Sequence, residues 1–394
     1  MNRKARKVRA QNVGGQSQAA VQSRPPRKKN RPFDATFLIL VLILVAFGLV
    51  MLFSASYAYA YYNEGNSFHY ITRQAIFAVA GIAAMLIISK IDYHIYERFC
   101  YVIWIVAVAL LVVVLFMPPI NFARRWIIIG GMTFQPSEIA KFAVIVVFAH
   151  LIDRNYKQLK TFRYGVLPFM AVLSITIGLM VLEPHLSGTI LIVTIGFAMM
   201  FVGGTGTKWF LIGGGLIAGA LVCLLLFTDV LEHAIPRLQM WKDPFIDAKG
   251  DGWQTVQSLL AIGSGGFFGL GLGNSRQKHL YVPEPHNDFI FSILCEELGL
   301  VGALIVIILF ILLVVRGFAI AMKAKDRFGS MLAMGLTFQV GLQALLNIAV
   351  VTNTLPNTGI SLPFFSYGGT SLLMLLGQMG VVLSVSRFSR LEKK

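Results

Sequence analysis

Ten apolar runs dominate the chain, and each is long enough, or nearly so, to cross a bilayer. About 20 apolar residues in a helix span the roughly 30 Å of hydrocarbon in a membrane. Backbone N–H and C=O groups find no water at that depth, so such runs must form helices or a closed barrel. The sequence therefore predicts an all-α polytopic membrane protein of about ten transmembrane helices. The runs are residues 36–55, 71–89, 99–117, 137–152, 165–182, 188–204, 209–228, 290–315, 329–352 and 367–386.

The composition excludes a water-soluble globule. Hydrophobic residues make up 56% of the chain and charged residues only 13%, which is about half the charged share of a soluble domain. The formal net charge of +16 is concentrated in the first 31 residues and in short loops. That distribution is typical of membrane topology and not of nucleic-acid binding. Cys100, Cys223 and Cys295 lie in or beside apolar runs without metal-ligand spacing, so we interpret them as packing residues.

The loop charges predict the orientation of the chain. Basic residues collect in every second connection, as the positive-inside rule requires when both termini are cytoplasmic. The connection 353–366 carries no charge, and the long connection 229–287, between helices 7 and 8, carries both signs. These two connections are predicted to be outer loops. The basic residues of the predicted cytoplasmic loops and C-terminus are Lys90, Arg98, Arg154, Lys157, Lys160, Arg163, Lys208, Arg316, Lys323, Lys325, Arg327, Arg387, Arg390, Lys393 and Lys394.

The chain divides into three predicted segments. Residues 1–34 are rich in Arg, Lys, Gln, Ser and Pro and are predicted to be a disordered cytoplasmic arm. Residues 35–387 form the ten-helix domain, and residues 388–394 form a basic cytoplasmic tail. The first apolar run ends in Ser54-Ala55-Ser56, which resembles a signal-peptidase site, but its length favours an uncleaved span.

The outer loop 229–287 is too long and too apolar in its middle to be a plain connector. Its apolar residues recur at helical spacing, which predicts a short helix at the outer interface. They are Trp253, Val256, Leu259, Leu260 and Ile262.

Ionisable residues in and beside the apolar runs gather on the predicted outer side. Charges in hydrocarbon are costly, so each one is a functional hypothesis. Glu138 and Lys141 share one helix face within ion-pair reach, and they either brace helices or line a cavity. Glu296 and Glu297 lie about 12 Å along the helix from Asp288, so the three cannot form a close carboxylate dyad on this helix. We expect a structural role for Glu296 and Glu297.

Three stretches resemble the SEDS family (shape, elongation, division and sporulation proteins), whose members are polytopic glycosyltransferases that polymerise lipid II into peptidoglycan. The resemblance covers nearly everything after the basic arm and is closest to the division and sporulation branch. One departure is His185, where many relatives carry an acid. The stretches are Arg124-Arg125-Trp126 with Gln135-Pro136-Ser137-Glu138-Ile139-Ala140-Lys141; Gly252-Trp253-Gln254 through Gly271-Leu272-Gly273 to residues 283–291 and 296–299; and residues 356–371.

The resemblance implies an essential role in polymerisation for Asp288, the acid of the D-F-I-F motif. Forming a β-1,4 glycosidic bond needs a base that deprotonates a sugar hydroxyl, and a carboxylate desolvated at the membrane boundary suits that task. Capping of the following helix is the alternative role for Asp288, and the two roles can coexist.

The leaving group would be a lipid-linked pyrophosphate, whose oxygens need cations or N–H donors. Arg124 and Arg125 are the first candidates, because guanidinium groups bind phosphate bidentately, and Lys141 with Glu138 beside it comes next. Arg276 and Lys278 follow a glycine-rich stretch, and they are either further ligands or solvated loop charges. The residues predicted to line the cavity or to support the structure around it are Glu183, Glu296, Glu297, Ser366 and Tyr367.

The cofactor requirement stays open. A pyrophosphate attracts divalent cations such as Mg²⁺ or Mn²⁺, yet no carboxylate cluster has the spacing of metal ligands, so no metal-binding residue is predicted.

The resulting prediction is an inverting peptidoglycan glycosyltransferase at the outer face of the bacterial cytoplasmic membrane, acting at the division septum or in sporulation. Its substrate would be lipid II, and the resemblance implies a class B penicillin-binding protein transpeptidase and other division proteins as partners. Two alternatives stay open: a transporter that flips lipid II through a polar cavity, and a non-catalytic scaffold of the division complex that docks through the basic arm.

Overall fold

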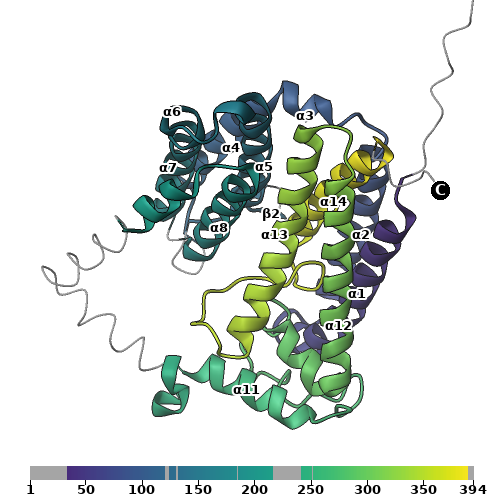
Figure 1. The fold of residues 1–394 in the computed structure, drawn as a ribbon. Coiled ribbons are helices and arrows are strands. Elements are labelled where there is room, and N and C mark those ends of the chain that lie inside the picture. The colour runs from purple at the N-terminus through teal and green to yellow at the C-terminus, as the bar shows by residue number, and fades with distance from the viewer. Residues whose placement is uncertain are drawn as a thin grey trace, which may run out of the picture. The chain divides into compact units, whose positions relative to one another are not determined.

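The computed structural model describes residues 33–119, 124–129, 132–183, 185–215, 241–250 and 252–388. These residues form a bundle of long apolar helices (Figure 1), so the prediction of a helical polytopic membrane fold is confirmed. Among the described residues, seven helical segments are long and apolar enough to cross a membrane. They are α1 (Ala35–Glu64), α2 (His69–Ile88), α6 with α7 (Phe162–Gly165 and Leu167–Leu182), α8 (Leu186–Gly203), α12 (Ile290–Met322), α13 (Arg327–Val351) and α14 (Gly369–Phe388).

Two more helices occupy predicted spans. α4 (Cys100–Val114) is shorter than the predicted run, and α5 (Pro136–Asn155) carries charged residues near both ends. The predicted span 209–228 is helical over residues 207–215, and the rest of it lies outside the described residues. The predicted arm, up to residue 32, and the tail from residue 389 also lie outside them.

Short elements connect the long helices. β1 (Ile127–Ile129) and β2 (Met132–Phe134) pair antiparallel just before α5. α3 (His94–Arg98), η1 (Tyr156–Gln158) and η2 (Pro244–Asp247) are single turns. α11 (Trp253–Gly265) confirms the short helix predicted in the loop before α12.

The connections between the long helices lie at two ends of the bundle. One end, here called the α11 end, holds α11 and the starts of α2, α5, α8, α12 and α14. The opposite end, here called the α3 end, holds α3 and the C-terminus of α14 (Figure 1). The described basic residues of the predicted cytoplasmic loops, such as Lys90, Lys157 and Lys323, belong to the α3 end.

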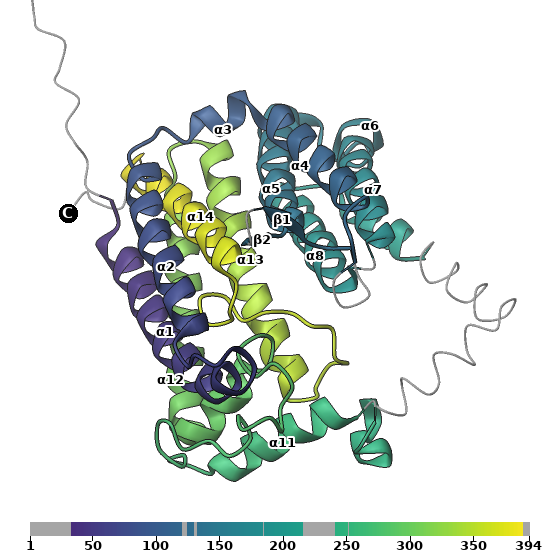
Figure 2. The same ribbon diagram turned by 180° about the vertical axis from the view of Figure 1, so that it is seen from behind.

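The long helices pack in neighbouring pairs. α14 lies along α2, α12 along α13, α4 along α5, and α11 against α12. Figure 2 shows α2 and α14 side by side from behind. The buried hydrophobic core runs through these contacts and includes Phe37, Phe148, Phe289 and Phe365.

α12 is interrupted at Gly299, whose φ of 66° and ψ of −166° are not helical. A Cβ atom there would lie 2.4 Å from the backbone nitrogen of Gly269, so only glycine lets the preceding loop approach this closely. The loop supplies partners for the backbone groups that the break would leave unpaired in the membrane. The hydrogen bonds run from Leu300 N to Gly266 O (2.9 Å), Val301 N to Phe267 O (3.2 Å), Leu270 N to Glu296 O (3.0 Å) and Gly271 N to Glu297 O (2.9 Å).

Candidate active site

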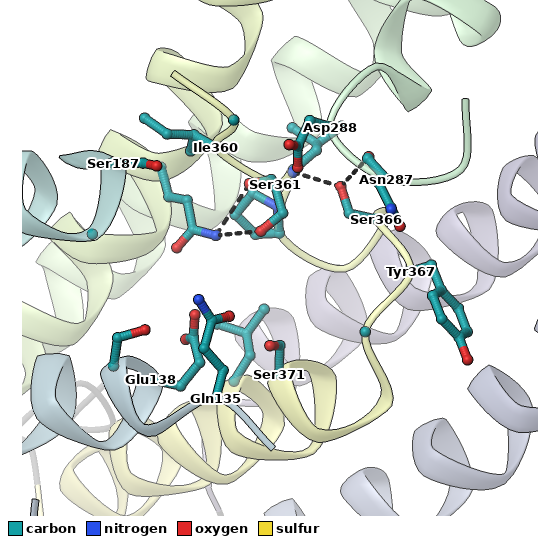
Figure 3. A pocket seen from close by; sticks show the side chains of 18 of the residues that line it. Gln135, Glu138, Ser187, Asn287, Asp288, Ile360, Ser361, Ser366, Tyr367 and Ser371 are labelled. Carbon is teal, nitrogen blue, oxygen red and sulfur yellow. Dashed lines mark hydrogen bonds between the residues drawn. The ribbon is translucent and has the colours of Figure 1, made fainter. Parts of the chain in front are cut away.

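A cavity of about 420 Å³ lies at the α11 end of the bundle, within the usual size range of small-molecule sites. Its walls come from β2 and the first turns of α5, the start of α8, the segment 284–288 before α12, and the segment 359–368 between α13 and α14 (Figure 3). The predicted site residues that line it are Arg125, Glu138, Lys141, Asp288, Ser366 and Tyr367.

Asp288 lines the cavity from the segment before α12. The N-cap residue of α12 is Phe289 and no side chain caps that helix, so the alternative role of Asp288 as an N-cap is wrong. A Cβ at Gly359, which has a φ of 64°, would lie 3.1 Å from Asp288 Oδ2. Burial and the nearby Glu284 raise the pKa of Asp288 to about 6, against an opposing effect of Arg125. The carboxyl is therefore ionised at neutral pH but is a stronger base than an ordinary aspartate.

Two cations form one wall of the cavity. Lys141 is 3% exposed, and its Nζ donates to Glu138 Oε1 at 2.8 Å and to Gln343 Oε1 at 3.3 Å. Burial lowers the pKa of Arg125, while Glu183 and Asp288 oppose that shift. A guanidinium retains its charge in such a site. The cavity thus presents fixed positive charge beside the Asp288 carboxylate.

Glu183 and His185 lie between α7 and α8. His185 lines the cavity and Glu183 does not. Glu183 is fully buried, and neither carboxylate oxygen has a hydrogen-bond partner among the described residues. Burial raises the pKa of Glu183 to about 8, with Arg125 opposing, so its carboxyl is mostly protonated at neutral pH. Burial, with Arg125 and Lys141, lowers the pKa of His185 to about 3. His185, which lines the cavity, is therefore neutral.

Two amide side chains of α13, which the sequence reasoning missed, hold the cavity together. Gln343 Nε2 donates to Ser361 O (3.1 Å) and to Ser361 Oγ (3.2 Å). One turn further along α13, Asn347 Nδ2 donates to the backbone oxygens of Asp288 (2.7 Å) and Ile360 (2.6 Å). The signal was present in the sequence, because amides four residues apart share one face of an otherwise apolar helix.

Ser366 and Tyr367 join the segment 359–368 to the segment that carries Asp288. Ser366 Oγ accepts from Leu362 N (2.7 Å) and donates to Asn287 O (2.8 Å), a bond drawn in Figure 3. Tyr367 N donates to His286 O (2.9 Å). The two segments therefore form one unit.

The family of the chain is decided by residues 34–391, which match the model of the FtsW, RodA and SpoVE cell cycle proteins. The chain belongs to this FtsW/RodA/SpoVE family. The SEDS resemblance that was predicted from three motifs is thereby confirmed.

Curated FtsW/RodA/SpoVE relatives are similar over most of their length. A probable peptidoglycan glycosyltransferase FtsW of Geobacter sp. (strain M18) is 38% identical over 358 residues, covering 90% of this chain and 96% of the relative. Stage V sporulation protein E of Bacillus subtilis (strain 168) is 39% identical over 368 residues, covering 92% and 99%.

Solved structures share the FtsW/RodA/SpoVE fold. One is a chain of a peptidoglycan synthase complex that coordinates polymerization and crosslinking, with a TM-score of 0.73 and 28% identity, covering 90% of this chain and 98% of that chain. Another is the rod shape determining protein RodA of Thermus thermophilus, with a TM-score of 0.67 and 26% identity, covering 91% and 98%.

Three basic residues predicted to bind pyrophosphate do not line the cavity of this FtsW/RodA/SpoVE protein. Arg124 is exposed and donates to Leu115 O at 2.8 Å. Arg276 is exposed in the loop before α12. Lys278 is buried and its Nζ lies 2.9 Å from Glu297 Oε1. The structure therefore does not bring these three residues together with Arg125. Arg124 turns back to the end of α4, and the loop that carries Arg276 and Lys278 docks on the outer turns of α12 and on α1. Exposed Arg276 fits the alternative of a solvated loop charge.

Glu296 and Glu297 lie apart from Asp288. Glu296 accepts from Ser275 Oγ and from Arg276 N (2.9 Å), so it closes the turn that follows the glycine-rich stretch. Glu297 is fully buried, and accepts from Lys278 Nζ and from Ser54 Oγ of α1 (2.7 Å). Both carboxylates hold the loop to the helices.

Among the described residues, no three His, Cys, Asp or Glu side chains gather closely enough to hold a metal ion. The structure assigns no residues to Mg²⁺ or Mn²⁺, and that cofactor stays a prediction.

Proposed function

We propose that the chain is a peptidoglycan glycosyltransferase that polymerises lipid II into β-1,4-linked glycan strands. One observation carries this proposal: a cavity at one end of the membrane bundle is lined by a carboxylate of raised pKa, Asp288, and by the two cations Arg125 and Lys141. A base beside fixed cations is what a glycosyl transfer with a pyrophosphate leaving group requires. The names of the relatives, FtsW and stage V sporulation protein E, agree with it.

The reaction is a single displacement. Asp288 takes the proton of the acceptor sugar hydroxyl as its oxygen attacks the anomeric carbon of the donor. The bond from that carbon to the pyrophosphate oxygen breaks, and its electron pair leaves with the pyrophosphate. Arg125 and Lys141 stabilise the charge that develops there. Attack from the face opposite the leaving group inverts the anomeric configuration.

Each cation has an anionic neighbour. Glu138 and Gln343 fix Lys141 from two sides, and the ionised Asp288 opposes the effect of burial on the charge of Arg125. Groups preorganised in this way need little rearrangement when charge develops.

The cavity is proposed to face the outside of the bacterial cytoplasmic membrane. The described basic residues of the predicted cytoplasmic loops, such as Lys90, Lys157 and Lys323, belong to the α3 end, so the positive-inside rule puts that end in the cytoplasm. We place the activity in septal wall synthesis or sporulation. The partner is a class B penicillin-binding protein, a proposal supported by the family resemblance and by the similarity to a chain of a peptidoglycan synthase complex.

The test is polymerisation of labelled lipid II by the purified protein with its partner in nanodiscs. Asp288→Asn is expected to abolish glycan chains. Arg125→Ala is expected to lower kcat/KM for lipid II by roughly 10–100-fold, because about 1.5–3 kcal/mol of a hydrogen bond to a charged group is lost in the transition state. Arg124→Ala, at the neighbouring exposed position, is the matched control and should change kcat/KM less than about threefold.

Polymer formation by Asp288→Asn at the wild-type rate would overturn the role of Asp288. Movement of lipid II across liposomes without polymer would favour the flippase alternative. No turnover of either kind by a folded complex would favour the scaffold.

A further inference from the structure

Four aromatic rings form a continuous cluster beside the cavity, and none of them has a role in the transfer chemistry described above. Tyr59 belongs to α1, Tyr70 to α2, and His286 and Tyr367 to the two segments that meet at the cavity. We call these four residues the aromatic shelf. Its ring centroids are separated by 4.3 Å (Tyr70–His286), 4.9 Å (Tyr70–Tyr367), 5.0 Å (Tyr59–His286) and 5.8 Å (His286–Tyr367).

The shelf is attached to the segment that carries Asp288. His286 precedes Asp288 by two residues, and its carbonyl oxygen accepts from Tyr367 N at 2.9 Å. Tyr367 also lines the cavity, on a different side from Glu138 (Figure 3). The cavity therefore has the cations Arg125 and Lys141 in its lining and Tyr367 as the one shelf residue that lines it. The ring of Tyr367 connects the cavity to Tyr70 of α2.

The shelf differs from the aromatic belt that anchors membrane proteins at the interface. Tyr61 and Tyr62, at the same end of α1, are 61% and 62% exposed, as belt residues are. Tyr59 and Tyr70 are only partly exposed, and their rings pack on His286, which is 3% exposed. The shelf rings are thus turned into the protein.

Polar atoms of the shelf side chains lack hydrogen-bond partners among the described residues. The hydroxyls of Tyr59, Tyr70 and Tyr367 have no hydrogen-bond partner in the part of the chain that the structure describes, and there His286 Nδ1 is buried without one. Burial lowers the pKa of His286 to about 4, so the shelf is uncharged at neutral pH. Uncharged ring faces with free hydroxyls suit a pyranose, whose C–H face packs on aromatic rings while its hydroxyls form hydrogen bonds. They do not suit a pyrophosphate.

We propose that the aromatic shelf is a saccharide subsite, which binds the acceptor sugar on Tyr70 and Tyr367 with its attacking hydroxyl directed to Asp288. The donor pyrophosphate then lies at the opposite, cationic wall. This subsite rests on the proposed function. It assigns the donor and the acceptor to different sides of the cavity.

The experiment measures two quantities for the full chain in nanodiscs. The first is the affinity for chitotetraose, a soluble N-acetylglucosamine oligomer, by saturation-transfer NMR. The second is the KM and kcat for labelled lipid II with the partner present. Tyr70→Ala is expected to weaken chitotetraose binding and to raise the KM about tenfold, while kcat changes less than about threefold. Tyr70→Phe keeps the ring and should recover most of the affinity.

Two further variants keep the test sharp. Tyr367→Phe removes only a hydroxyl that has no partner among the described residues, so it cannot act through misfolding, and it should weaken chitotetraose binding about threefold. Tyr61→Ala, an exposed tyrosine at the same end of α1, is the matched control and should match the wild type.

The outcomes separate the subsite from the proposed function. If the wild type polymerises lipid II, and Tyr70→Ala and Tyr367→Phe bind chitotetraose and lipid II as it does, the subsite is refuted. An equal loss in Tyr61→Ala would also refute it, because the tyrosines would then act as an interfacial belt. If the wild type binds chitotetraose through Tyr70 but forms no polymer, the subsite stands and the proposed function falls.

Discussion

Replacement of Asn347 by Ala should slow catalysis far more than it destabilises the protein. Asn347 is fully buried in α13. Its single amide nitrogen donates to the backbone oxygens of Asp288 at 2.7 Å and of Ile360 at 2.6 Å. One side chain therefore fastens the segment that carries the proposed base to the segment 359–368.

The magnitude follows from the atoms that lose or change partners. Two buried carbonyl groups lose a donor, at about 1–3 kcal/mol each. Asn347 Oδ1 is itself buried without a partner among the described residues, so its removal returns about 1–3 kcal/mol. The net loss in the free energy of unfolding is about 1–3 kcal/mol. A displacement of about 1 Å at the reacting atoms, by contrast, lowers the rate about 100-fold.

The assay compares kcat for lipid II polymerisation with the melting temperature, in nanodiscs. Gln339→Ala is the matched control, because Gln339 is buried two turns earlier on α13 and donates to Gln378 Oε1 at 3.1 Å, away from the cavity. It should lose similar stability but less than about threefold in kcat. Equal losses of kcat in the two variants, or a wild-type kcat in Asn347→Ala, would refute the positioning role.

Four more predictions concern the effects of pH on activity and on stability, a buried ion pair and the break in α12. The value of kcat/KM should fall about tenfold per pH unit below about pH 6, because Asp288 must be deprotonated and burial raises its pKa to about 6; a flat profile down to pH 5 contradicts this. Ionised Asp288 is disfavoured in the folded state, so Asp288→Asn should raise the melting temperature at pH 7 and lose that advantage below about pH 4, where the wild-type carboxyl is protonated in both states. Lys278→Met leaves Glu297 buried without its cation and should lower the free energy of unfolding by about 3–5 kcal/mol, most of which the double variant with Glu297→Gln should regain in thermal unfolding; no recovery would show that the two residues are not coupled. Gly299→Ala should sharply reduce the folded protein recovered from membranes, because its Cβ would lie 2.4 Å from a backbone nitrogen. Gly263→Ala, whose Cβ would meet no atom within 4 Å, is the control, and equal yields of the two variants would argue against a required break.

Hydropathy was sufficient to predict the long helices, because the bilayer imposes their length and composition. The structure places the starts of α2, α8, α13 and α14 within two residues of the predicted runs. α1 was predicted to end at residue 55 but continues to Glu64, where Gly65 ends it in a left-handed conformation. Its last turns contain Tyr, Ser and Asn. These residues are too polar for hydropathy to predict a membrane span, although they continue the helix.

The site was only partly predictable, because its parts meet through loops. Lys141 and Glu138 share a helix face, so their pairing follows from spacing alone. Arg124 and Arg125 are equivalent in the sequence, and only the fold turns Arg125 toward the cavity. Lys278 forms an ion pair with Glu297, nineteen positions later in the chain. Sequence spacing does not predict this pair, because one residue lies on a loop and the other on the following helix.

The break at Gly299 also bears on how the protein enters the membrane. Residues 300–322 form a helix of about 35 Å, long enough to span the bilayer alone, and Arg316 near its end is their single charged residue. The insertion machinery can therefore recognise this part as an ordinary hydrophobic segment. Asp288, Glu296 and Glu297 need not partition into lipid with it. Glu296 and Glu297 dock with the loop 266–271, which is synthesised just before them, whereas Asp288 is fastened by Asn347 of α13, which is synthesised after it.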